Sequence, residues 1–165
     1  MPGTPEPSLG SQRANASTAA VLTVALLLPA VLLRDAAPAV PLALGIGLLY
    51  AVVLLAVWAA ARYVADDFVW DLRDDPRWPV ALVSTAWVVL GLQAAIPAYG
   101  YVRWGLVVPL LVLALVTWFL TNVFLGVRGE SDPIGLYVLY GPMVTVGLLV
   151  LGGLELVARH GVSLL

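Results

Sequence analysis

The chain has 165 residues, of which 62% are apolar and only 11% are charged, and its mean hydropathy is +1.00. A water-soluble domain carries about 25% charged residues. The net charge is −2, and without a basic cluster there is no reason to expect a nucleic-acid partner. This composition excludes an ordinary soluble domain and predicts an all-α, polytopic integral membrane protein.

The residue types that are missing exclude several kinds of chemistry. All eight basic residues are arginine, so no lysine can form a Schiff base. The chain has no cysteine, which excludes thiolate metal sites, and with His160 as its one histidine it cannot ligate haem through two histidines. We therefore expect no cofactor. The arginine-only basic set and the abundance of Ala, Val, Leu and Gly point to a GC-rich prokaryotic genome and a cell-membrane location.

The amino-terminal part divides into a polar tail and a first apolar segment. Residues 1–16 are rich in proline, glycine and serine and offer little to bury, so we predict a disordered tail. Residues 17–165 are predicted to form one transmembrane helical domain. Its first span, 17–33, is about 26 Å long as a helix. Cleavage of this segment as a signal peptide is the alternative, although the charged pair after it does not fit a cleavage site.

Four further apolar segments follow, predicted as spans at 39–61, 79–96, 104–126 and 134–158. The five segments together contain one acid and no base, whereas the short connectors hold most of the charge, as expected for spans and loops. Most tryptophan and tyrosine residues, Tyr137 among them, fall near span ends, as an interfacial aromatic belt requires. The sequence therefore predicts a bundle of five transmembrane helices.

The arginines in the connectors predict the orientation of the bundle. With five spans, one side of the membrane receives five arginines and the other receives three, and the richer side is expected inside the cell. We therefore expect the amino terminus inside and the carboxyl terminus outside. The richer side holds Arg13, Arg62, Arg73, Arg77 and Arg128, and the other holds Arg34, Arg103 and Arg159.

The second span carries a stripe of small side chains, with Ala39, Ala43, Gly47 and Ala51 recurring every four residues. Such a stripe lets another helix backbone approach closely. Five helices of this length have few internal faces. We therefore expect membrane lipids as neighbours and homo- or hetero-oligomerisation through small-residue helix faces.

Half of the ten acidic residues lie within residues 63–79. On a helical wheel an apolar arc opposes the aspartates, which predicts a short amphipathic juxtamembrane helix continuing the second span. Asp67, Asp71 and Asp75 recur every four residues, and such a ladder can hold a magnesium ion against a diphosphate. These three aspartates are the metal-site candidates. A solvated acidic face is the favoured interpretation, because the spacing does not match the DDxxD motif of prenyl-transferring enzymes.

Glu155 is the one ionisable residue inside a predicted span, and carboxylates in hydrocarbon usually serve a purpose. Arg159 follows it by four residues, in the order that favours a helical ion pair. The alternation of spans brings both residues to the same end of the bundle as Gln93, Arg103 and His160. These five residues form a candidate polar site for a substrate, a proton or a lipid headgroup.

No catalytic motif for nucleophilic, metal-dependent or nucleotide chemistry occurs in the chain. We therefore predict an accessory subunit or scaffold of a membrane assembly, without enzymatic activity. One alternative is a small oligomeric transporter or channel that uses Glu155, Gln93 and Arg103. The other is a magnesium-dependent lipid-modifying enzyme that uses the three aspartates.

Overall fold

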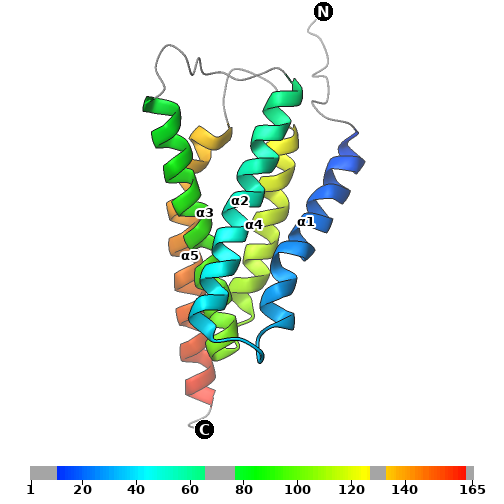
Figure 1. Ribbon diagram of the computed structural model, residues 1–165. Helices are drawn as coiled ribbons and strands as arrows, with labels where there is room; N and C mark the ends of the chain where they lie inside the picture. The colour runs from blue at the N-terminus through cyan, green and yellow to red at the C-terminus, as the bar shows by residue number, and fades with distance from the viewer. Residues whose placement is uncertain (1–10, 66–76, 127–132, 163–165) are drawn as a thin grey trace, which may run out of the picture.

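The computed structural model describes residues 11–65, 77–126 and 133–162. In these ranges the chain forms five helices and no strand (Figure 1), and each helix is long and apolar enough to cross a membrane. The predicted all-α fold with five spans is confirmed. The proposed juxtamembrane helix, with Asp67, Asp71 and Asp75, lies outside the described residues. The helices are α1 (Gln12–Leu32), α2 (Ala39–Ala65), α3 (Arg77–Trp104), α4 (Val108–Gly126) and α5 (Pro133–Val162).

The helices run up and down in alternation, so the start of α1 and the end of α5 lie at opposite ends of the bundle (Figure 1). The most extensive contact is between α2 and α3, and α3 also packs against α5. Helix α1 lies at the edge of the bundle and packs mainly on α4. The core therefore lies chiefly among α2, α3, α4 and α5.

Helix α1 begins at Gln12, five residues before the start expected at residue 17. Its first turn is capped by Ser11, whose hydroxyl accepts a hydrogen bond from the backbone N–H of Ala14 at 3.3 Å. Such a cap satisfies one of the four N–H groups that a helix start leaves unpaired. The helix therefore begins directly after Ser11, nearer the amino terminus than expected.

Helix α3 continues through Pro97 to Trp104, eight residues beyond the expected end at residue 96. Proline lacks an N–H and normally interrupts a helix, but membrane helices tolerate it where neighbouring helices enclose the backbone. Pro97 is buried. Helix α4 accordingly begins at Val108 and not at residue 104.

The turn from α3 to α4 needs a glycine. Gly105 has a φ of 70°, a left-handed conformation that costs glycine little and other residues more. Its N–H donates to the carbonyl of Tyr101 at 2.8 Å, and the N–H of Leu106 donates to the carbonyl of Gly100 at 3.2 Å. The turn is therefore short, and it fixes where α4 starts.

The small-residue stripe of α2 is used inside the chain. A β-carbon placed on Gly47 would lie 2.5 Å from the carbonyl oxygen of Gly91 and 2.9 Å from the Cβ atom of Ala95, both on α3. Ala43 and Ala51, on the same stripe, are also buried. Gly47 and its neighbours on the stripe are therefore used in close packing of α2 on α3.

Candidate functional site

Four buried side chains from four helices form a continuous hydrogen-bonded chain through the core. The hydroxyl of Tyr137 (α5) donates to Oε1 of Gln93 (α3) at 2.6 Å. Nε2 of Gln93 donates to the hydroxyl of Tyr50 (α2) at 3.4 Å, and that hydroxyl lies 3.0 Å from Oγ1 of Thr117 (α4). Tyr50, Gln93 and Thr117 have no exposed surface, and Tyr137 is 8% exposed. We call these four residues the core polar chain.

The hydrogen bonds of the core polar chain have a single direction. Thr117 donates its one hydroxyl hydrogen to the backbone carbonyl of Leu113, at 2.6 Å. Its oxygen must therefore act as the acceptor for Tyr50, whose hydroxyl in turn accepts from Gln93. The donors run in order from α5 through α3 and α2 to α4. Every member thus has a partner, as buried polar groups in a medium of low dielectric require.

Thr121 lies one turn beyond Thr117 on the same face of α4. It is completely buried, and its Oγ1 has no hydrogen-bond partner among the described residues. Buried hydroxyls are usually paired. Thr121 is therefore an exception, a buried hydroxyl next to the core polar chain that no described residue pairs.

Glu155 caps the start of a neighbouring helix. Its Oε1 accepts from the backbone N–H of Val107 at 3.1 Å, and its Oε2 accepts from that of Val108 at 2.8 Å. The unpaired N–H groups and the dipole of a helix start both favour a negative charge there. Arg159 donates to Oε1 of Glu155 at 2.5 Å, so the expected i, i+4 pair is present. The carboxylate is thus fully engaged in joining α5 to the start of α4.

The structure does not gather the predicted polar site into one cluster. Gln93 belongs to the core polar chain, whereas Arg103 lies ten residues further along α3, about 15 Å away at helical rise. Nδ1 of His160 lies 2.9 Å from the backbone carbonyl of Leu156 on its own helix. Arg103, Glu155, Arg159 and His160 lie near the same end of the bundle, but Gln93 does not join them.

Of the four members of the core polar chain, only Gln93 was predicted from the sequence as a site residue. Tyr137, expected in the aromatic belt, is buried and is the first donor of the chain. Tyr50 lies in the middle of α2, and a tyrosine at that depth needs a partner for its hydroxyl. That depth was the signal that could have identified Tyr50. Arg62, counted only for orientation, is also buried, with 2% of its surface exposed.

No group of three or more potential metal ligands occurs within the described ranges. The three aspartates of the magnesium hypothesis lie outside these ranges, so they are not part of this site. The polar residues that the structure does place together are joined by hydrogen bonds between helices.

Comparisons with protein-family models, with curated proteins and with solved structures found no match. The class of protein is therefore inferred from the helices and their contacts. Five long apolar helices, with buried polar groups paired between helices, define a multi-pass membrane protein.

Proposed function

We propose that this chain is a non-catalytic subunit or scaffold of a membrane assembly. The observation that carries the proposal is that Gln93 and Glu155 both form hydrogen bonds to other helices. Polar residues inside membrane proteins commonly mark ion or substrate pathways. Here Gln93 joins two tyrosines and Glu155 caps α4. Both side chains hold helices together, which is the chemistry expected of a structural component.

The outer surface of α5 is the best-suited contact face for a neighbour. In the most apolar stretch of α5, only 22% of the residues are buried inside the bundle. This is the smallest share among the five helices. Met143 is 69% exposed and Val150 is 54% exposed. Gly147 lies between them, and a β-carbon added to it would have nothing within 4 Å, so another helix could approach closely. We assign oligomerisation, with itself or with a second protein, to this face.

The test is purification in a mild detergent, followed by mass measurement of the intact complex. A stoichiometric neighbour or a second copy is expected. Replacing Met143 and Val150 together by tryptophan should release it, because the bulk prevents close helix approach. Val21→Trp is the matched control, since Val21 is equally exposed, at 69%, on the outer face of α1. A lone chain in both detergent and lipid nanodiscs would contradict the proposal.

A further inference from the structure

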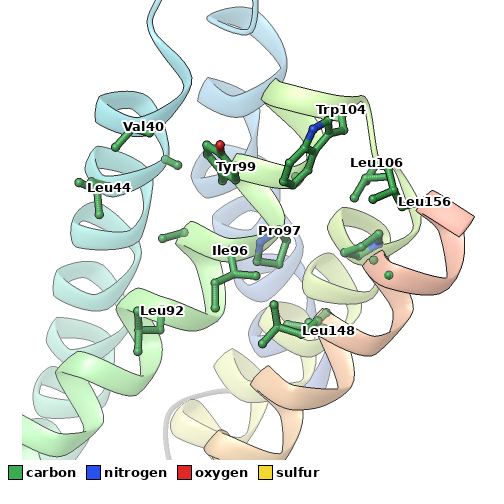
Figure 2. A pocket seen from close by; sticks show the side chains of 17 residues that line it. Val40, Leu44, Leu92, Ile96, Pro97, Tyr99, Trp104, Leu106, Leu148 and Leu156 are labelled. Carbon is green, nitrogen blue, oxygen red and sulfur yellow. The ribbon is translucent and has the colours of Figure 1, made fainter.

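An apolar groove opens between α2, α3 and α5 near the end of the bundle that holds Glu155. The groove has a volume of about 500 Å³. Its wall includes Leu44, Leu92, Ile96 and Leu148 (Figure 2). Trp104 and Tyr99 stand at one end, with their rings edge to face and 5.2 Å between the ring centres. Paired aromatic rings of this kind are typical of the level where hydrocarbon meets headgroups.

The groove adjoins a second, polar cavity of about 460 Å³. Both cavities are lined by Val40 and Tyr99, and the second is also lined by Arg34 and Arg103. The guanidinium of Arg34 lies over the ring of Tyr101, 5.0 Å from its centre. The apolar groove thus lies beside two cationic side chains.

These two arginines carry the positive charge of this end. Among the described residues, neither Arg34 nor Arg103 forms an ion pair. Arg159, whose charge is balanced by Glu155, lies close to Arg34, because a β-carbon on Gly105 would meet both guanidinium groups within 3.6 Å. Within the described ranges, the other charged or titratable side chains of this end include the exposed Asp35 and His160, whose ring is bonded to its own helix.

We propose that this groove binds an anionic phospholipid, with an acyl chain along α3 and the phosphate at Arg34 and Arg103. Lipid tails gain little from an apolar wall, because the bilayer is equally apolar. Selectivity must therefore come from the headgroup. Guanidinium groups bind phosphate through paired hydrogen bonds. The proposal does not depend on the assembly proposed above.

The test is a titration of the purified full chain with dioleoyl phosphatidylglycerol or dioleoyl phosphatidylcholine, read by native mass spectrometry. We expect tighter binding of the anionic lipid. An arginine near the membrane surface changes lipid affinity about fivefold, so Arg103→Gln should weaken binding about fivefold and the double variant with Arg34→Gln about thirtyfold. Arg13→Gln, an exposed arginine at the opposite end, should change nothing.

A second pair of variants tests whether the acyl chain occupies the groove. Gly153 lines it and has open space for a side chain, so Gly153→Leu should fill it and weaken binding of the anionic lipid. Gly45→Leu, equally open but outside the groove, is the control. Leu92→Trp, from the opposite wall, serves if Gly153→Leu does not fold. Equal affinity for the two lipids would overturn the proposal, as would unchanged binding in the double arginine variant or in the groove variants.

Discussion

Gly47 and Gly91 bring the backbones of α2 and α3 so close that a β-carbon on Gly47 would lie 2.5 Å from the carbonyl oxygen of Gly91. Backbone cannot move aside as the end of a flexible side chain can. The contact therefore requires the two helices to separate before any larger residue is accepted at position 47.

Gly47→Ala should destabilise the bundle by about 1–3 kcal/mol, the usual cost of overpacking. Gly45→Ala is the matched control, because a β-carbon added to Gly45 would have nothing within 4 Å. It should be neutral, or stabilising by up to about 1 kcal/mol through helix propensity. Thermal unfolding in detergent, followed by circular dichroism, measures both. Equal midpoints for the two variants would show that the close approach is absent.

Removing the cap on α4 should also destabilise the protein. Glu155→Gln keeps the size of the side chain, but it loses the charge and leaves an amide N–H₂ facing a backbone donor. Charge-assisted hydrogen bonds contribute about 1.5–3 kcal/mol, and we expect a loss in that range. Arg159→Gln should cost less than about 1 kcal/mol, because the arginine side chain is 47% exposed. If Arg159→Gln cost as much as Glu155→Gln in thermal unfolding, the ion pair and not the cap would dominate.

A double-mutant cycle on Tyr137 and Gln93 tests the core polar chain. Tyr137→Phe leaves Oε1 of Gln93 without its donor, and Gln93→Leu leaves the Tyr137 hydroxyl without its acceptor. Each should cost about 1–3 kcal/mol. The coupling between them should be about 0.6 kcal/mol, the average measured for hydrogen bonds between membrane helices, and at most about 1.7 kcal/mol. Additive effects of the two substitutions would mean that the 2.6 Å contact does not form in the membrane.

Gly105→Ala tests the turn between α3 and α4. A left-handed residue with a side chain costs about 1–2 kcal/mol, and the new β-carbon would lie 3.1 Å from Nη2 of Arg34. We expect a lower unfolding midpoint than for Gly45→Ala, which adds a methyl group on a regular, open helix face. Because the turn positions the N–H groups that Glu155 caps, combining Gly105→Ala with Glu155→Gln should be less than additive.

The number of spans could be predicted from the sequence, because a helix that crosses the lipid must be a long apolar segment, and hydropathy detects such segments directly. Helix ends were harder to predict. The third span was expected to end at residue 96, yet α3 runs on through Pro97 to Trp104, because packing and not local propensity decides inside the bundle. The capping role of Ser11 is a local hydrogen bond that a hydropathy profile does not register.

The site was harder still, because a helix that is apolar all round does not show which face points inward. Glu155 and Arg159 were paired correctly, since their spacing lies on one helix. The partners of Glu155 at residues 107 and 108 are backbone N–H groups at the start of another helix, which no side-chain pattern reports. Gln93 was expected at the end of the bundle but lies in its core. The sequence did not show this, because it does not show which face of α3 points inward.

The core polar chain also bears on how the protein is made. Its first donor, Tyr137, is on the last helix, whereas its three other members are on α2, α3 and α4. Until α5 enters the bilayer, Oε1 of Gln93 has no tyrosine to receive from, and a polar atom in hydrocarbon is costly. A nascent chain that stalls after the fourth helix would therefore leave this atom unpaired until the fifth helix is inserted.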